Sequence, residues 1–533
     1  MRRACGILAM VITAGVGHTQ KNPPEIVAEA PSLKERAIGA ERRGDLAKAA
    51  QLYLDLTRQD PQEVKWVLAA GRCLGRVGRY NDSLDLLERS FGRFSDVIEI
   101  PALVAKTYVL KAEASVAQGV RDVNVTLNFE EAVRVARSVV QRHPGHKDAR
   151  LILAKAHFQL AEMEEAHKHA REAVRRFPRH QGGHVLLGDI AYQRFVTLRN
   201  QINVENPRGR QQADLLAQAA AERERASRAY AKAAEIDNTR AYPRVRLGDL
   251  QAWNGNTEQA LLMYQEALAV DPTTTVNHSW ITTNVESERR TELYRNATEA
   301  YRKKPGMEKG KLATLYWYLA YALLEKRDFK ASHLTFSKAA KANPLFQNSH
   351  YYAMLAAYWG GEEDVAQAHA WHYASQNAAG FADLIRSPVE AKRKDEVLGI
   401  LEYFAQSSFK ADRLPESRDL NHILAKVKAT APHWNNYAFL CRETGKFEDS
   451  LSAYQNALSL DPDSPQLLND TAVILQYHLP TRENLTMAAT YYRRVLVEAT
   501  RVLNDPKASD EKKTRTRQAR QDATGNLKKM GKQ

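Results

Sequence analysis

Cysteine is scarce in this chain: Cys5, Cys73 and Cys441 are the three among 533 residues. They lie too far apart in the sequence to suggest a disulfide framework or a cysteine-based metal site. Long apolar runs are lacking as well. The run near the N-terminus, residues 4–16, is shorter than the roughly 20 residues that a membrane-spanning helix needs. We therefore expect no transmembrane span.

The sequence also lacks the short motifs that carry familiar catalytic chemistry. It contains no GxxxxGK[ST] phosphate loop, no HExxH zinc motif and no GxSxG nucleophile elbow. Adjacent carboxylates such as Glu164 and Glu165 diverge on a helix, whereas paired catalytic carboxylates must converge. We therefore expect no enzyme activity and no cofactor.

Histidines are crowded into one stretch, but their spacing does not form a recognised ligand pattern. The sequence alone therefore favours solvated or capping histidines over a metal site. The stretch contains His143, His146, His157, His167, His169, His180 and His184.

A concentrated nucleic-acid-binding pattern is missing too, although the net charge is +14, from 77 basic and 63 acidic residues. The excess is spread out: residues 121–230 hold 19 basic and 13 acidic residues, and residues 505–533 hold nine and four. Neither segment shows an RRM, KH or zinc-finger pattern beside its charge. We expect no nucleic-acid partner.

What the chain does contain is a repeated unit, clearest at residues 431–464. Its two halves each have helical periodicity, and Gly445 lies between them where one helix can end and the next begin. A step of 34 residues recurs along the chain, from Gly44 to Gly78 and from Pro144 to Pro178. The signature positions of the unit are Trp434, Tyr437, Ala438, Cys441, Gly445, Ser450, Tyr454, Ala457 and Pro462.

This pattern resembles the tetratricopeptide repeat (TPR) superfamily over about four-fifths of the chain. The resemblance implies an all-α fold in which helix-turn-helix repeats stack into a right-handed superhelical solenoid with a concave groove. It also implies binding of a protein or peptide partner, and it does not imply catalysis.

The repeat phase predicts the following organisation. An N-terminal array covers residues 30–274, with insertions near 118–129 and 197–222, and a degenerate helical repeat follows at 275–310. Further units are expected at 313–380, a non-repeat helical spacer at 381–430 and C-terminal units at 431–500. The charged residues 505–533, almost free of large apolar side chains, read as a disordered basic tail.

The resemblance places certain first-helix positions in the groove. Aromatic side chains there could give a partner large buried contacts, and asparagine could hydrogen-bond a peptide backbone, although packing between helices is the competing interpretation. The asparagine ladder is incomplete, so capture of a terminal carboxylate is doubtful. The candidate groove residues are Trp317, Tyr321, Tyr351, Tyr358, Trp359, Asn435, Asn436 and Asn469.

The N-terminus, residues 1–20, has two arginines followed by the short apolar run, which is typical of a secretory signal without a clean cleavage site. The leading hypothesis is therefore a non-catalytic scaffold, periplasmic or secreted, that holds a protein partner. The alternatives are an intracellular, cytoplasmic adaptor and a non-catalytic glycan- or polymer-binding protein that uses the aromatic groove.

Overall fold

The computed structural model describes residues 32–344 and 346–531, and all regular structure in them is helical. The chain divides into two compact units between Lys232 and Ala233, and each unit is described by itself. The signal-like residues 1–20 lie outside the described residues. Among the described helices, none has the length and apolar character required to cross a bilayer.

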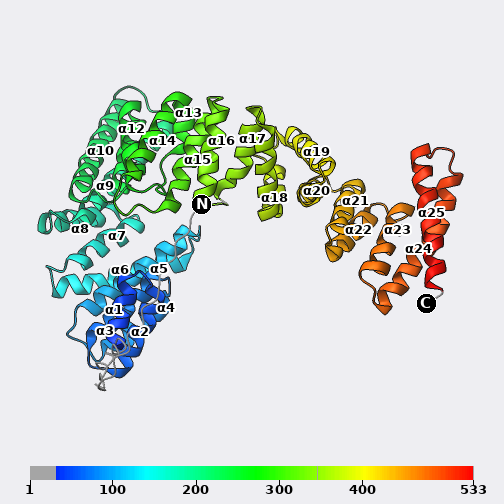
Figure 1. The fold of residues 1–533 in the computed structure, drawn as a ribbon. Helices are drawn as coiled ribbons and strands as arrows, with labels where there is room; N and C mark the ends of the chain where they lie inside the picture. The colour runs from blue at the N-terminus through cyan, green and yellow to red at the C-terminus, as the bar shows by residue number, and fades with distance from the viewer. Residues whose placement is uncertain (1–31, 345, 532–533) are drawn as a thin grey trace, which may run out of the picture. The chain divides into compact units, whose positions relative to one another are not determined.

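Unit 1 is a series of consecutive helices, each packed against the next (Figure 1). The surplus residues of the two predicted insertions lengthen helix pairs: α5 and α6 have 19 and 20 residues, and α9 and α10 have 25 and 28. The helices are α1 (Leu33–Arg42), α2 (Leu46–Gln59), α3 (Val64–Arg76), α4 (Tyr80–Phe91), α5 (Glu99–Ala117), α6 (Val123–Arg142), α7 (Lys147–Gln159), α8 (Met163–Arg176), α9 (Gln181–Glu205) and α10 (Gly209–Ile236), whose last turn crosses into unit 2.

Unit 2 continues the same all-α repeat architecture. Its helices are α11 (Tyr242–Trp253), α12 (Thr257–Val270), α13 (His278–Asn284), α14 (Ser287–Arg302), α15 (Leu312–Glu325), α16 (Phe329–Ala342), α17 (Ser349–Trp359), α18 (Glu363–Arg386), α19 (Lys394–Lys410), α20 (Leu414–Lys428), α21 (Ala431–Glu443), α22 (Phe447–Leu460), α23 (Pro465–Val473), α24 (Arg482–Asn504) and α25 (Asp510–Met530). Short 3₁₀ turns, η1 (Lys309–Lys311) and η2 (Phe346–Asn348), precede α15 and α17, and a π-helical turn, η3 (Ile474–His478), follows α23.

The turn inside many of the helix pairs contains a residue with positive φ. Gly44 has φ +80° and Gly445 has φ +73°, a conformation that glycine adopts without the steric cost of a Cβ atom. The following helix then starts at its own cap; Asp45, for example, accepts a hydrogen bond from the Lys48 amide. The predicted role of Gly445 is confirmed.

A serine hydrogen bond closes several of the pairs. The hydroxyl of a serine on the second helix donates to the carbonyl oxygen of the residue twelve positions earlier on the first helix, at 2.7–2.9 Å, and both groups are buried. The small side chains bring the two backbones close enough for this bond. The four pairs are Ser83–Gly71, Ser332–Ala320, Ser417–Ala405 and Ser450–Ala438.

The Ser417 bond changes the interpretation of residues 381–430, which the sequence suggested were a non-repeat spacer. Helices α19 and α20 form a pair with the same serine–carbonyl bond, and its turn residue, Asp412, has φ +58° where other repeats have glycine. The segment therefore contains a repeat-type helix pair. The irregular part of the segment is therefore shorter than predicted, and it follows a kink in α18 at Asn377, where φ is −152° and ψ is 65°.

The expectation of a disordered tail at 505–533 is wrong for residues 510–530, which form α25. Ser509 caps the helix, and Ala519 and Ala523, four residues apart, are buried against the core that contains Tyr492. The Asn526 amide donates to the Tyr492 hydroxyl at 3.0 Å. Leu527 and Met530, the two large apolar side chains of α25, pack against the same core, but two such residues in a charged segment of this length gave little sign of a docked helix.

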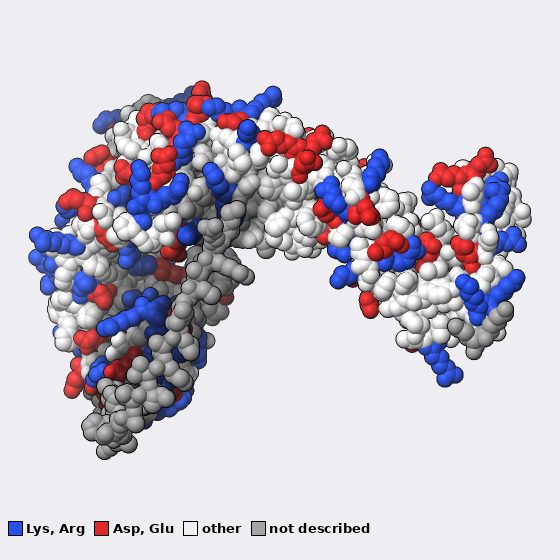
Figure 2. Space-filling model, in the orientation of Figure 1, with Lys and Arg blue, Asp and Glu red and all other residues white. Residues whose placement is uncertain are grey.

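The surface charges agree with the dispersed pattern of the sequence. On the face drawn in Figure 2, basic and acidic side chains are interspersed in both units. Many of them form pairs within one helix, such as Arg58–Asp55 and Arg89–Asp85. Exposed pairs of this kind contribute little stability, about 0.2–1 kcal/mol each.

Candidate functional site

A basic hollow in unit 1 is the most distinctive surface feature of the described residues. It has a volume of about 650 Å³ and is lined by one face each of α8, α9 and α10, because the contributing residues recur three or four positions apart on each helix. We call it the α8–α10 hollow. Its lining is His167, Arg171, Val174, His184, Leu187, Ile190, Ala191, Arg194, Glu222, Arg225, Arg228, Ala229 and Lys232.

The α8–α10 hollow combines an apolar floor with a cationic rim. Valine, leucine, isoleucine and alanine side chains form the apolar part, and four arginines and one lysine oppose a single carboxylate, that of Glu222. The nearby Arg194 and Arg171 add to burial in lowering the pKa of His167. The hollow therefore has a positive potential beside a surface that can accept apolar groups.

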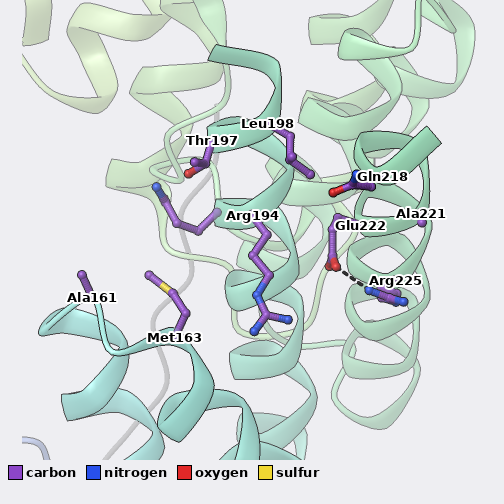
Figure 3. A pocket seen from close by; sticks show the side chains of 10 residues that line it. Ala161, Met163, Arg194, Thr197, Leu198, Gln218, Ala221, Glu222 and Arg225 are labelled. Carbon is purple, nitrogen blue, oxygen red and sulfur yellow. Dashed lines mark hydrogen bonds and ion pairs between the residues drawn. The ribbon is translucent and has the colours of Figure 1, made fainter. Parts of the chain in front are cut away.

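A second hollow, of about 690 Å³, adjoins the first and shares Arg194, Glu222 and Arg225 with it (Figure 3). Its other side is formed by Ala161 and Met163, at the turn before α8 and its first residue. The shared residues make the two hollows one continuous trough along α8, α9 and α10.

The charged side chains of the trough are only partly neutralised. The Arg194 guanidinium pairs with Glu164 at 2.7 Å, Arg225 pairs with Glu222, and Arg228 lies 3.9 Å from Glu224. No ion pair or hydrogen bond of the Arg171 side chain is found among the described residues. The Oε2 atom of Glu222 is buried and has no hydrogen-bond partner there, so it can accept a hydrogen bond from a bound molecule once the side chain rotates toward the hollow.

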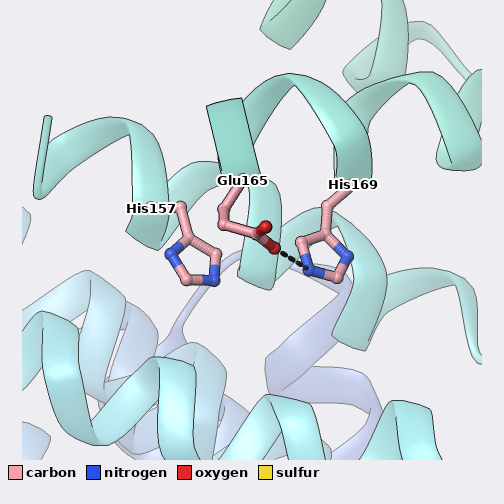
Figure 4. A group of neighbouring side chains, drawn as sticks. All are labelled: His157, Glu165 and His169. Atoms are coloured by element: carbon pink, nitrogen blue, oxygen red, sulfur yellow. Dashed lines mark ion pairs between the residues drawn. The ribbon is translucent and has the colours of Figure 1, made fainter. Parts of the chain in front are cut away.

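A second polar group lies on the α7–α8 pair, where His157, Glu165 and His169 come together (Figure 4). One potential ligand atom from each residue lies within 4.8 Å of the other two. The imidazole rings of His157 and His169 are parallel, with centroids 5.6 Å apart. Burial, followed by the field of His157, lowers the pKa of His169 to about 4.

The aromatic residues predicted for a groove pack against one another and against the core of unit 2, and Tyr351 is the one among them that is fully buried. Trp317 stacks on Tyr321 with ring centroids 5.2 Å apart, and Tyr352 meets Trp317 edge-on. Tyr351 has no exposed surface, and its hydroxyl donates to Glu390 at 2.8 Å. The structure therefore leaves no surface on Tyr351 for a partner.

The remaining predicted residues lie in mixed surroundings. Tyr358 is half-buried beside Phe404, and Trp359 is half-buried with its Nε1 donating to Glu396 at 2.8 Å. Asn436 is exposed. The Oδ1 atoms of Asn435 and Asn469 are shielded from solvent without a donor. That these side chains contact a partner stays a prediction.

Comparison with known proteins supports the repeat family. Family models described as tetratricopeptide repeat match residues 128–190 and 431–464. The first match covers most of α6, all of α7 and α8, and the first part of α9, and the second covers α21 and α22. These matches support placing the chain in the TPR superfamily. Among curated proteins, none matches the chain.

Solved structures with similar folds include several TPR proteins. A thermophilic TPR protein of Thermus thermophilus is 14% identical, with 47% of this chain and 98% of that chain covered and a TM-score of 0.26. YrrB, a TPR protein with an unusual peptide-binding site, is 15% identical over 44% and 97%, with a TM-score of 0.27. A TPR protein of Parabacteroides merdae is 12% identical over 61% and 97%, with a TM-score of 0.32.

The sequence contains part of the information needed to predict the trough and the His157–Glu165–His169 group, although no recognised motif marks either. Glu165 and His169 are four residues apart on α8, so they share a face. His157 joins them only because α7 and α8 pack as an antiparallel pair. The cations of the trough come from three helices, so no contiguous basic run marks them.

Proposed function

We propose that this protein is a non-catalytic scaffold that binds an acidic, partly apolar segment of a protein partner in the α8–α10 hollow. The observation that carries the proposal is the cationic rim around an apolar floor, with five cations against one carboxylate. An extended segment can place apolar side chains on the floor and carboxylates at the rim. Electrostatic complementarity of this kind chiefly gives specificity and fast association.

The free carboxylate oxygen of Glu222 favours a peptide over a simple anion. A bound peptide backbone offers N–H donors, and Glu222 Oε2 is a buried acceptor that lacks one. An inorganic anion would place negative charge beside this carboxylate without supplying a donor. The occupant that fits both features is a polypeptide with acidic side chains.

The test measures binding of labelled short peptides in which acidic and large apolar residues alternate. The matched peptides replace each acid by its amide. We expect the acidic peptides to bind more tightly, with affinity falling as salt is raised because rim charges are screened. Arg171→Glu combined with Arg228→Glu should weaken binding roughly tenfold or more, since each reversal removes an attraction and adds a repulsion.

The control variant changes the charge equally on the same unit but away from the hollow. Arg58→Glu combined with Arg89→Glu reverses two exposed arginines that, like Arg228, lie near a carboxylate on their own helix. This variant should bind the acidic peptides like the unaltered protein. Equal binding of acidic and amide peptides, or equal weakening in both double variants, would refute the proposal, as would selective binding of single-stranded RNA.

We also propose that the scaffold is exported, on the basis of the signal-like pattern at residues 1–20. N-terminal sequencing of the native protein in fractionated cells tests this. A mature chain that begins between about residues 17 and 31 and is found outside the cytoplasm supports export. An intact Met1 in the cytoplasm contradicts it and leaves the peptide-binding proposal unaffected.

A further inference from the structure

The His157, Glu165 and His169 side chains supply two imidazole nitrogens and one carboxylate oxygen at one point on the α7–α8 pair. Two histidines and a glutamate are a donor set that binds Zn²⁺ with a fourth position left for water. None of the three residues belongs to the lining of the α8–α10 hollow. We propose that these three residues form a binding site for Zn²⁺ or a similar divalent transition metal.

The hydrogen bond on the far side of the His157 ring prepares this residue as a ligand. His157 is 2% exposed, and its Nδ1 atom lies in contact with the Glu162 carboxylate. Because the carboxylate accepts, the Nδ1 atom carries the proton and the Nε2 lone pair stays free. Outer carboxylates orient zinc-binding histidines in the same way.

The Nε2 atom of His157 is an unpartnered atom of the group. Like the Nδ1 atom of His169, it is buried and has no hydrogen-bond partner among the described residues. A buried polar atom without a partner costs free energy that an ion at this point would recover. Two observations therefore support the metal site: the grouping of the three residues, and a buried ring nitrogen whose lone pair has no partner.

One pair of ligand atoms already has nearly the spacing of a tetrahedral site, and the third atom lies within 4.8 Å of both. Ligand atoms at about 2.0–2.1 Å from a tetrahedral zinc ion lie roughly 3.4 Å apart, and the His169 Nε2 and Glu165 Oε2 atoms are already 3.7 Å apart. The Glu165 side chain retains 46% of its exposure, so its rotamer can change without disturbing the core. His157 and His169 belong to neighbouring packed helices, whose separation fixes the third distance.

An ion can reach the group from solvent, and the Lys168 ammonium would compete with it for Glu165. A hollow of about 900 Å³, whose lining includes Glu165, Lys168 and His169, connects the group to solvent. The Lys168 ammonium lies 3.1 Å from both oxygens of Glu165. Binding of a cation therefore has to displace this ammonium, and removal of Lys168 should strengthen metal binding.

A bound ion would join the two helices across their turn. The turn contains Ala161, a residue with a side chain held at φ +61°, where the other repeats mostly have glycine. A metal that bridges His157 on α7 to Glu165 and His169 on α8 would hold this strained turn closed. We therefore expect the metal to stabilise unit 1.

The experiment uses the full chain without an affinity tag, freed of metal by a chelator. Titration calorimetry with Zn²⁺ should show one saturable site, and Co²⁺ should give the intense visible absorption of a tetrahedral site. Zn²⁺ should also raise the temperature of thermal unfolding. Absence of saturable Zn²⁺ binding would overturn the proposal.

Variants of partly exposed residues locate the site without removing the buried His157. Glu162→Gln, which alters the outer carboxylate, should weaken Zn²⁺ binding about 10–100-fold. His169→Asn and Glu165→Gln each remove a ligand and should weaken it more, and Lys168→Ala should strengthen it. His184→Asn, a histidine of the same unit outside the group, should leave the affinity unchanged. Unaltered affinity in the ligand variants, or equal loss in His184→Asn, would place the metal elsewhere and refute the proposal.

Discussion

The trough of unit 1 and the aromatic core of unit 2 differ in how many of their side chains already have packing, hydrogen-bond or ion-pair partners within the protein. In the trough, Arg171 has no ion-pair partner among the described residues and Glu222 has a free oxygen. In the aromatic core on α15–α18, Trp317, Tyr321 and Tyr351 pack on other rings or donate to carboxylates. A repeat surface that is ready to bind is one whose groups lack internal partners, and aromatic content alone does not identify it.

The same comparison explains the role of the irregular segment after α18. Glu390 is 1% exposed and accepts from the hydroxyls of both Tyr351 and Tyr352, while Arg393 lies 3.5 Å away. The segment folds back on the aromatic core and supplies a buried acceptor. The core of unit 2 is therefore closed from within the chain, whereas the trough is open.

The largest expected change in the free energy of unfolding comes from removing an aromatic ring of the core. Tyr351→Ala should lower the free energy of unfolding by about 3–5 kcal/mol, because it empties a fully buried site and leaves Glu390 short of a donor. Arg171→Ala should change it by less than about 0.5 kcal/mol. Urea unfolding followed by circular dichroism measures both. Equal effects in the two variants would contradict the contrast between core and trough.

Acidification should destabilise unit 2 next most strongly. Burial lowers the pKa of His350 and of His369 to about 4, so the folded state binds fewer protons than the unfolded state, whose histidines titrate near 6.5. This contribution is present above about pH 6.5 and is lost as the pH falls toward 4, by about 1.4 kcal/mol for each unit of difference.

Unfolding midpoints measured between these pH values test that sign. His369→Gln keeps a polar side chain but cannot take up the proton, so it should flatten the pH dependence. His184→Gln, in the trough of unit 1, should leave the slope as it is. A stability that rises on acidification would show that these rings are not buried in the neutral form.

The smallest expected loss of stability is that of the Trp359→Phe variant. The change removes one hydrogen bond, to Glu396, and should cost about 1 kcal/mol of stability. Affinity for the acidic peptides should stay within the error of the measurement if the trough is the binding surface. A clear loss of affinity in this variant would support the aromatic groove predicted from the sequence and weaken the contrast.

The fold could be predicted because glycine, proline and small residues recur in phase. Gly44, Gly78 and Gly445 mark turns with positive φ, which the helix-pair geometry requires. The repeat-type pair α19–α20 was not predicted because its turn residue, Asp412, has positive φ although it is not glycine. Helix α25 was not predicted because its apolar contacts come from only four residues, Ala519, Ala523, Leu527 and Met530, in an otherwise charged and polar segment.

The candidate site was harder to predict because its residues meet only in space. No familiar ligand spacing joins His157, Glu165 and His169 in the sequence, because two packed helices supply them. In the aromatic case, helical spacing fitted both a groove and a packed interface, since both repeat with the turn of the helix. Depth of burial, which distinguishes them, depends on neighbouring helices.

The close approach of glycine to tyrosine within two helix pairs restricts how the sequence can change. A Cβ atom at Gly188 would lie 2.6 Å from the Tyr230 ring, and one at Gly248 would lie 2.5 Å from the Tyr264 ring. Any larger residue at either glycine therefore requires a smaller partner ring, and a smaller ring alone leaves a cavity. Each pair can be exchanged only by two coordinated substitutions, so it should persist or disappear as a unit as related sequences diverge.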